Sequence, residues 1–400
     1  IREKLKARDP ESTLSQMDDM SFLNDLGLVK YDEGNLKLTI AGLLFVGKEK
    51  SIHRLLPQAE VIYLHYSEDN LEEYDARLDI KLPIISIIDR LSEKIQDSNR
   101  IVNVQVGLFR LEIVDFTLKV FQEALLNALA HRDYQNQGSI YVKHYPDKVV
   151  IENPGGFPEG ITQNNIITHP SVPRNKLIAE TLQRLKYVQR TGQGVDIIYR
   201  DMVSSGKPYP EYRSYSDAVS LTMYSGIDDI EFVKFIAEEQ NSRQRNFSLA
   251  ELMILRFLMD NRRISLSVAM NLVQGTRDIA QKSLNNLIKE QLIEVTGREY
   301  MLTARMYDAV KSTVEYTKDK SIQYIKAKEM IMEYIESNES ITNEKIRELC
   351  GFTKQQARNT LDKMRKEQLV ELLGKGRSSK YIKTSGTRKK LEKNSKKTRK

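Results

Sequence analysis

One predicted helix carries three polar side chains that could act on a bound ligand. Within residues 116–131 (FTLKVFQEALLNALAH), Glu123, Asn127 and His131 are spaced four residues apart, so they drift only slowly around the helix and can face one cavity. A carboxylate can orient a water molecule for attack, and an amide oxygen can be a ligand of Mg²⁺. A solvated polar helix face has the same spacing, so this pattern alone leaves both interpretations open.

Segments further along the chain add glycines and cations at places where a backbone could approach a phosphate. The helix is followed by HRDY, a predicted strand ends in IENPGG (151–156), and an Arg-Asn pair and RTGQGV (190–195) come later. Glycine allows the backbone to approach a phosphate closely, and the N-terminus of a helix favours a bound anion. We expect these segments to contribute Asp133, Asn153, Gly155, Gly156, Arg174, Gly192 and Gly194 to the same cavity.

The periodicity around these segments predicts an alternation of strands and helices. A strand is expected over 60–66, helices over 82–97 and 116–131, and a hairpin from 139–144 and 148–152. Ahead of them we expect a helix with apolar residues spaced over 14–26, ended by Gly27, and then a short hairpin turned at 33–35. The fold class is therefore α+β.

The motifs EALLNALAHRDY, IENPGGFPEG, Arg174-Asn175 and RTGQGVDII together resemble a domain of Schlafen AlbA-type bacterial and archaeal regulators, which are often labelled RecG-like helicases. That domain is a divergent relative of the GHKL ATPases of the gyrase, heat-shock-chaperone and histidine-kinase types. The resemblance spans residues 1–226. It implies a GHKL-like α/β sandwich that binds ATP and Mg²⁺. Because the chain begins at Ile1, we also expect a missing upstream domain.

The resemblance also implies roles for individual residues. Glu123 matches the general base, and Asn127 matches the Mg²⁺-binding asparagine. Asn153 stands where the family has an aspartate that reads the adenine amino group. The nucleotide-binding set that follows is Asn127, His131, Asp133, Asn153, Gly155, Gly156, Arg174, Gly192 and Gly194.

A run that resembles a P-loop is interpreted differently. Residues 42–48 (GLLFVGK) have the P-loop spacing, but Glu49 replaces the serine or threonine that would hold Mg²⁺. The four intervening residues are apolar, so we expect this run to pack in a core. Without a P-loop motor the sequence does not support helicase activity. A weak ATPase activity remains open.

Two helical triplets, each followed by a pair of strands, form an internal repeat typical of winged-helix modules. The first is expected over helices 249–261, 265–272 and 276–290 and strands 293–296 and 299–302. The second is expected over helices 327–337, 343–350 and 353–368 and strands 369–373 and 379–382, after a linking helix over 304–320. The third helix of such a module can enter the major groove, with Thr276 and Thr353 as N-caps.

The side chains suited to phosphates and base edges lie on these third helices and on the second hairpin. They are Lys354, Gln355, Arg358, Asn359, Lys375, Arg377 and Lys380 in the second module, and Arg277, Gln281 and Lys282 in the first. The second module is the more basic. Winged helices also serve as protein-interaction modules, so that alternative stays open.

Charge and composition restrict the class of protein. The net charge of +7 is concentrated in residues 385–400, which contain eight basic residues and one acidic residue. We expect this tail to be disordered and to bind phosphates. The lone Cys350 excludes an intramolecular disulfide and favours a reducing compartment. No apolar run is long enough to span a membrane, so we expect a cytoplasmic protein without membrane contact.

These observations predict five segments. They are an N-terminal helix and hairpin (1–50), a GHKL-like domain (51–226), a first winged helix (227–305), a linker helix with a second winged helix (306–384) and the basic tail (385–400). The leading hypothesis is a transcriptional regulator that binds double-stranded DNA, senses a nucleotide and forms a homodimer. The alternatives are a Mg²⁺-dependent GHKL-type ATPase and an oligomeric assembly or defence protein.

Overall fold

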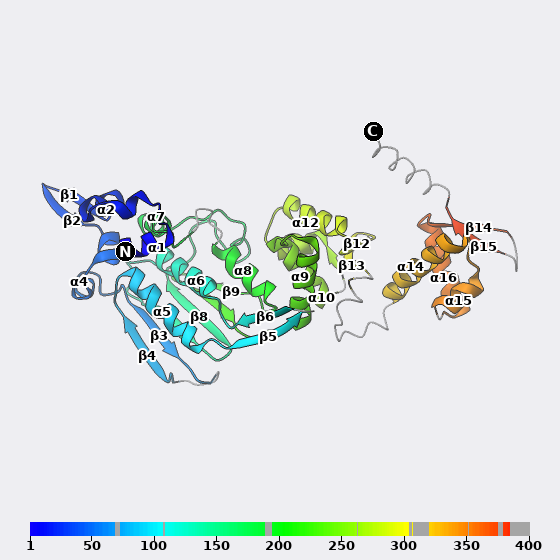
Figure 1. Ribbon diagram of the computed structural model, residues 1–400, viewed down its shortest axis with the longest axis horizontal. Helices are drawn as coiled ribbons and strands as arrows, with labels where there is room; N and C mark the ends of the chain where they lie inside the picture. Colours follow the sequence, from blue (N-terminus) through cyan, green and yellow to red (C-terminus); the bar gives the residue numbers. More distant parts are fainter. Residues whose placement is uncertain are drawn as a thin grey trace. The chain divides into compact units, whose positions relative to one another are not determined.

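The computed structural model describes residues 1–68, 73–106, 109–188, 194–261, 263–303, 306, 320–350, 352–374 and 379–384 (Figure 1). The chain divides into two compact units, residues 1–303 and 304–400. The finer division predicted within residues 1–303 remains a prediction. Gly192, Lys375, Arg377 and the tail 385–400 lie outside the described residues, as does most of the predicted linking helix.

A six-stranded mixed sheet is the centre of the first unit. Its strand order is β4-β3-β7-β8-β10-β9, and only the β3–β7 pair is parallel among the pairs of this sheet that the structure describes. The strands are β3 (Val61–His65), β4 (Ala76–Ile80), β7 (Ile140–His144), β8 (Lys148–Pro154), β9 (Glu211–Ser214) and β10 (Ala218–Tyr224). Together with the helices around it, this sheet gives the α+β class that the sequence predicts.

Helices cover one face of this sheet and form the main core with it. They are α5 (Ile84–Ser98), α6 (Leu118–His131), α7 (Lys176–Arg184) and α8 (Gly194–Ser204). Phe121, Leu125 and Leu129 of α6 are buried against Val142 and Ile151 of the sheet. Because this apolar face is fixed in the core, the opposite, polar face of α6 is held toward the ends of β8 and β10.

The N-terminal segment packs onto the same core. It consists of α1 (Arg2–Arg8), a 3-10 helix (Thr13–Gln16), α2 (Asp19–Asp25), β1 (Val29–Asp32), β2 (Asn35–Leu38), α3 (Ile40–Val46) and α4 (Glu49–Leu55). The expectation of one helix over 14–26 is wrong, because Met17 is extended and the Asp18 side chain caps a new helix at Met20 and Ser21. The apolar run before Gly47 is confirmed as core, with Leu43, Leu44 and Phe45 buried in α3.

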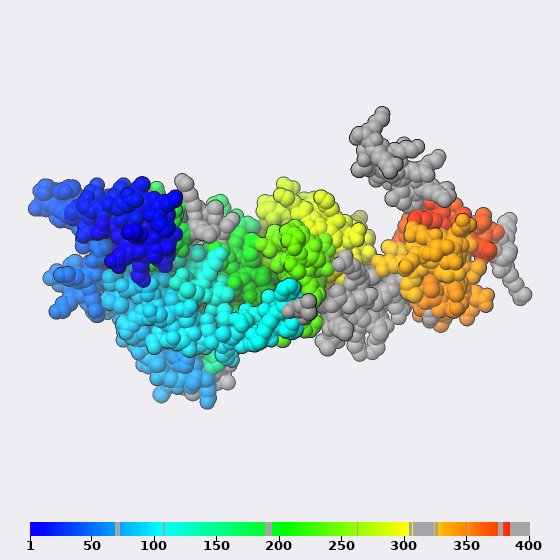
Figure 2. Space-filling view, viewed as in Figure 1, coloured from blue at the N-terminus to red at the C-terminus, as the bar shows by residue number. Residues whose placement is uncertain are grey.

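A hairpin packs against the first helix that follows the sheet region. Strands β5 (Ile101–Val106) and β6 (Phe109–Val114) pair with each other, and β5 lies against α9 (Ile230–Arg243). Val104, Val106 and Ile113 of the hairpin form a small apolar cluster with Val233 of α9. Figure 2 shows the cyan hairpin side by side with the green helix on the surface of this unit.

The rest of the first unit is a helical module with a small three-stranded sheet. It contains α10 (Leu249–Asp260), β11 (Ile264–Ser265), α11 (Leu266–Leu272), α12 (Arg277–Lys289), β12 (Ile293–Thr296) and β13 (Glu299–Leu302), with strand order β11-β13-β12. Thr276 caps α12 by accepting from the Ile279 N–H, as predicted. Ser248 and Glu251 form a capping box at α10.

The second unit repeats this element order. It contains α14 (Lys320–Asn338), α15 (Asn343–Cys350), α16 (Lys354–Lys366), β14 (Val370–Leu373) and β15 (Lys380–Lys383), and Ile341 bridges to Tyr381. Thr353 caps α16 as predicted, in a capping box with Gln356. Helix α14 begins seven residues before the predicted start at residue 327. Among the helices that are described, none is both long and apolar enough to cross a membrane.

Candidate functional site

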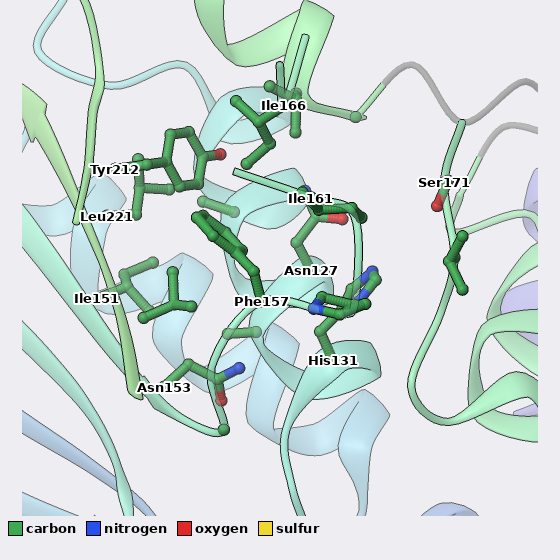
Figure 3. Close-up of a pocket in the computed structure, with 18 of the residues that line it drawn as sticks. Asn127, His131, Ile151, Asn153, Phe157, Ile161, Ile166, Ser171, Tyr212 and Leu221 are labelled. Carbon is green, nitrogen blue, oxygen red and sulfur yellow. The ribbon is translucent and has the colours of Figure 1, made fainter. Parts of the chain in front are cut away.

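A pocket lies between the polar face of α6, the ends of β8 and β10, the start of α8 and residues 161–172 (Figure 3). Its volume is about 1010 Å³ with the solvent at its opening included. Seven of the residues expected to share one cavity line it: Glu123, Asn127, His131, Asn153, Gly155, Gly156 and Gly194. The structure thus brings together side chains that the sequence distributes over some 70 positions.

The three polar residues of α6 contribute a buried acid, a half-buried amide and a half-buried histidine. Glu123 is 7% exposed, and burial raises the pKa of its carboxyl, against the opposing influence of Lys119. Burial lowers the pKa of His131, and the positive charge of Arg174 lowers it further, so the imidazole is neutral at pH 7. Thr117 begins this helix by accepting from the Val120 N–H, which fixes the turn at which each side chain emerges.

Gly194 allows α8 to begin directly against these side chains. A Cβ added at Gly194 would overlap Glu123 Oε1 and lie 3.1 Å from Asn127 Nδ2. The first turn of α8 therefore meets the acid and the amide of α6. The positive end of that helix lies where an anionic group of a ligand would be favoured.

Two asparagines of the pocket each have a buried amide atom without a hydrogen-bond partner. Among the described residues, neither Asn127 Nδ2 nor Asn153 Oδ1 has a partner, although both atoms are inaccessible to solvent. Asn153 is near the end of β8, where it pairs with Val219 of β10. A buried polar atom without a partner destabilises the empty protein, so both amides have unused capacity for a ligand.

The turn after β8 has a backbone that requires glycine. Gly155 has φ +103°, and a Cβ there would lie 3.0 Å from Asp133 Cβ. Arg174 secures this turn by donating to the backbone oxygens of His131 (3.1 Å) and Gly156 (2.7 Å). Asp133 donates its backbone N–H to Pro154 O (2.8 Å). Arg174 and Asp133 are thus beside the pocket and support it, but they do not line it.

The part of the apolar pocket wall that comes from β9 and β10 is what the sequence motifs missed. Figure 3 shows Ile151, Tyr212 and Leu221 on the strand side, with the Phe157 ring extending toward them. The ring centroids of Phe157 and Tyr212 are 6.4 Å apart. Tyr212 and Leu221 come from β9 and β10, more than 50 residues after the glycine turn. The alternation of apolar and polar residues in the sequence AVSLTMY (218–224) could have indicated the strand β10, but not its place in the wall of the pocket.

Residues 161–172, which we call the pocket loop, form another part of the site that the motifs missed. Ile161, Ile166, His169 and Ser171 of this loop line the pocket. Asn165 holds the loop together: its Oδ1 accepts from the Thr162 N–H (2.7 Å) and its Nδ2 donates to Gly160 O (2.9 Å). The polar TQNN run at 162–165 is typical of such a turn and could have indicated it.

The residues expected to contact DNA lie mainly on exposed helix faces. In the second unit Lys354, Gln355, Arg358, Asn359 and Lys380 are exposed. In the first unit Arg277 and Lys282 are exposed on α12. Gln281 is half-buried and donates to Asn285 Oδ1 (3.0 Å) and to the Tyr300 hydroxyl (3.3 Å), so it supports the hairpin of its own module.

The part of the chain that the structure describes contains no group of three or more histidine, cysteine, aspartate or glutamate side chains that could hold a metal ion. A protein-only cage is therefore not found there. A Mg²⁺ ion commonly keeps few protein ligands and completes its shell with substrate phosphates and water, which is compatible with Asn127 as a single amide ligand.

Comparisons with known proteins bear on the sheet region and on the fold. Residues 137–223 match a family model described as "Putative ATP-dependent DNA helicase recG C-terminal", and residues 1–62 match one described as a domain of unknown function. The first match supports an ATPase-like domain that contains β7 to β10 and the pocket loop; α6, with Glu123 and Asn127, precedes it. No curated protein matches the chain.

A solved structure shares the fold. The DIP2311 protein from Corynebacterium diphtheriae has a TM-score of 0.63 and 18% sequence identity, and the similarity covers 96% of this chain and 67% of that one. At this identity the likeness concerns the fold alone.

Proposed function

We propose that this protein is a DNA-binding transcriptional regulator whose pocket binds a nucleotide, with ATP and Mg²⁺ as the expected ligand. The observation that carries the nucleotide part is the convergence of Glu123, Asn127, Asn153, the Gly155–Gly156 turn and Gly194 at the start of α8 on one pocket. The pocket lies partly within the stretch similar to the RecG C-terminal family. We further propose a GHKL-like sandwich related to the Schlafen AlbA-type regulators, a homodimer and a cytoplasmic location.

The chemistry of the pocket suits the parts of a nucleotide. The wall of Ile151, Phe157 and Leu221 offers apolar surface to a base, and the Asn153 amide can hydrogen-bond a base edge. The first turn of α8 at Gly194 suits phosphates. Asn127 would hold Mg²⁺ through its Oδ1, and the bound ion would neutralise phosphate charge. The unpaired Asn127 Nδ2 is a donor and suits a phosphate oxygen instead.

Nucleotide binding is tested by thermal unfolding of the whole chain with and without ATP and Mg²⁺. Saturating ATP should raise the free energy of unfolding by about 3 kcal/mol at a hundredfold excess over Kd. Asn153→Ala should weaken this response, whereas Asn164→Ala, an exposed asparagine of the pocket loop outside the pocket lining, should keep it. No stabilisation of the wild type at millimolar ATP would contradict the nucleotide assignment.

The DNA part of the proposal rests on the repeated element order. Three helices followed by a hairpin are the layout of a winged helix, in which the third helix enters the major groove. α12 and α16 are the third helices, and each presents exposed cations away from its buried stripe. On α16 the stripe is Ala357, Leu361 and Met364, whereas Lys354 in the first turn and Arg358 are exposed.

Fluorescence anisotropy on duplex DNA at several salt concentrations tests this role. The double charge reversal Lys354→Glu with Arg358→Glu should weaken binding at least tenfold, because each lost phosphate contact also removes counterion release. The control Lys345→Glu with Arg347→Glu changes the net charge equally on the supporting helix α15. Because it also breaks the Lys345–Glu348 ion pair (3.0 Å), thermal unfolding must show that this double variant is folded. Equal loss in both doubles would indicate a nonspecific charge effect. DNA affinity that is negligible while subunits associate would instead favour an assembly protein.

A second candidate function is a weak Mg²⁺-dependent ATPase. It is favoured by Glu123, because burial raises the pKa of this carboxyl toward the range in which a general base works best. Phosphate release from ATP should then require Mg²⁺ and disappear in Glu123→Gln. Phosphate release that survives this substitution would contradict the role of Glu123. We do not propose helicase activity.

A further inference from the structure

Gln274, which lies outside the pocket lining, joins the pocket to the helical module. It occupies the turn between α11 and α12, two residues before the N-cap Thr276. Its Oε1 accepts from the backbone N–H of Ile167 in the pocket loop at 3.2 Å. Its backbone oxygen accepts from the Thr168 hydroxyl. Two of its polar groups therefore accept hydrogen bonds from a loop that lies more than 100 residues earlier in the chain.

The same glutamine also contacts the helix that begins in the pocket. Its side chain lies near the Tyr199 hydroxyl of α8: burial raises the pKa of that hydroxyl, and Gln274 has a smaller, opposite effect. Gly194 at the start of α8 lines the pocket. Gln274 thus touches two separate elements of the pocket, the loop and α8. A change in the position of either element must be transmitted to the turn before α12, or these hydrogen bonds must break.

An apolar cluster joins the same elements as these hydrogen bonds. Tyr199, Leu249 and Met253 are buried together, and Ile167, Val195, Tyr209, Tyr212 and Leu272 pack against them. Val195 and Tyr212 line the pocket, whereas Leu249 and Met253 belong to α10 and Leu272 to α11. The Tyr199 and Tyr212 rings are stacked, with centroids 6.4 Å apart. Pocket wall and helical module therefore share one packed core, which transmits displacement because it cannot be compressed.

We propose that occupancy of the pocket is coupled to the position of α12 through Gln274. This inference rests on the proposed function for its biological meaning, since α12 is one of the two proposed DNA-reading helices. A ligand that draws the pocket loop or the start of α8 inward shifts the position of the turn before Thr276. By thermodynamic reciprocity, DNA bound at α12 then changes the affinity of the pocket for its ligand by the same factor.

The test measures backbone hydrogen exchange over residues 272–282 of the whole chain, with the pocket empty or filled. One arm fills the pocket with ATP and Mg²⁺. The other needs no knowledge of the natural ligand: in a Cys350→Ser background, Ser171→Cys in the pocket lining is labelled with N-phenylmaleimide. Filling should change exchange in this segment about fivefold or more, the lower end of typical coupling strengths.

Two glutamines provide a matched pair of variants. Gln274→Ala should abolish the exchange response. Gln291→Ala should retain it, because Gln291 follows the other end of α12 and has the same left-handed backbone (φ +59° against +52°), so the backbone strain of the two alanines is equal. Gln274→Glu keeps the acceptor for the Ile167 N–H and should therefore keep the exchange response.

The outcomes separate the coupling from the nucleotide proposal. ATP that stabilises the protein without changing exchange before α12 overturns the coupling and leaves nucleotide binding intact. A response to the maleimide without any stabilisation by ATP supports the coupling and contradicts the nucleotide assignment. An absence of response in both arms, or an equal response in Gln274→Ala, overturns the coupling.

Discussion

At the scale of single residues, the pocket is built at a cost to stability. Asn127 Nδ2 and Asn153 Oδ1 are buried without partners, and each such group typically costs about 1–3 kcal/mol. Asn165, in the same site, has both amide atoms hydrogen-bonded. The asparagines that line the pocket thus have unpaired amide atoms suited to a ligand, whereas Asn165 of the pocket loop, outside the lining, has a structural role.

Asn153→Leu should therefore leave the ligand-free protein as stable as the wild type or up to about 1 kcal/mol more stable, because an apolar group replaces an unpaired one. The same variant should lose the stabilisation by ATP. Urea unfolding with and without nucleotide measures both effects. Asn165→Leu is the contrast: it should lower stability, since it removes satisfied bonds. A loss of more than about 2 kcal/mol in ligand-free Asn153→Leu would assign the amide a structural role.

His144 makes the stability of the first unit sensitive to acid. Burial, with a smaller contribution from His65, lowers its pKa to about 4, and the Tyr63 hydroxyl lies 2.9 Å from its Nδ1. Asp115 opposes this shift and Arg100 adds to it. The pKa of an unfolded histidine is about 6.5, so between these values the unfolded chain binds more protons.

The stabilisation that depends on neutral His144 is complete above about pH 6.5 and should be lost as the pH falls to 4, by about 2 to 3 kcal/mol. His144→Gln should flatten this part of the stability–pH profile, measured by urea unfolding. His53→Gln, an exposed histidine of α4, is the control and should keep the wild-type slope. A wild-type profile that is already flat from pH 6.5 to 4 would contradict the role given to His144.

At the scale of elements, local signals predicted structure better than they predicted the site. β12 and β13 have the predicted bounds, and α12 and α16 begin behind the predicted caps, because caps and turns depend on neighbouring residues. The polar face of α6 could be predicted for the same reason. The wall from Tyr212 and Leu221 could not, since it depends on strand pairing between distant segments. The bond from Ile167 to Gln274 joins residues 107 apart and has no local signal.

The capping box at α16 should contribute to the stability of the second unit. Thr353→Ala removes the acceptor for the Gln356 N–H and should lower the stability of this unit by about 1 kcal/mol. Hydrogen exchange in α15 and α16 measures it. Arg358→Ala, at an exposed position of the same helix, should have little effect. Exchange in α16 that Thr353→Ala leaves unchanged would show that packing alone fixes the start of this helix.

At the scale of the whole molecule, the excess positive charge lies at one end of the chain. Residues 385–400 carry eight basic residues and one acidic residue, which accounts for the net charge of +7. These residues lie outside the described structure, and their role follows from the sequence alone. A concentrated charge of this kind acts on DNA mainly through counterion release, which makes affinity depend on salt.

Deletion of residues 385–400 should lower the affinity for duplex DNA and make it less dependent on salt. Each phosphate contact adds about 0.9 to the slope of log K against log salt, so losing several contacts should reduce the slope by several units. Anisotropy titrations from low to moderate salt measure the slope. Stabilisation by ATP serves as the control and should not change. An unaltered slope would show that the tail does not bind phosphates.

The strand order of the large sheet affects how fast the first unit folds compared with the second. Val61 pairs with Ile140, and Lys148 pairs with Tyr224, so the chain must close long loops before the local pairs β3–β4, β7–β8 and β9–β10 join into one sheet. In residues 320–384 the helices and the β14–β15 hairpin are formed from near neighbours along the sequence. During refolding, the second unit should therefore reach its native state well before the sheet closes, and unpaired strands of the first unit are the stage most exposed to aggregation.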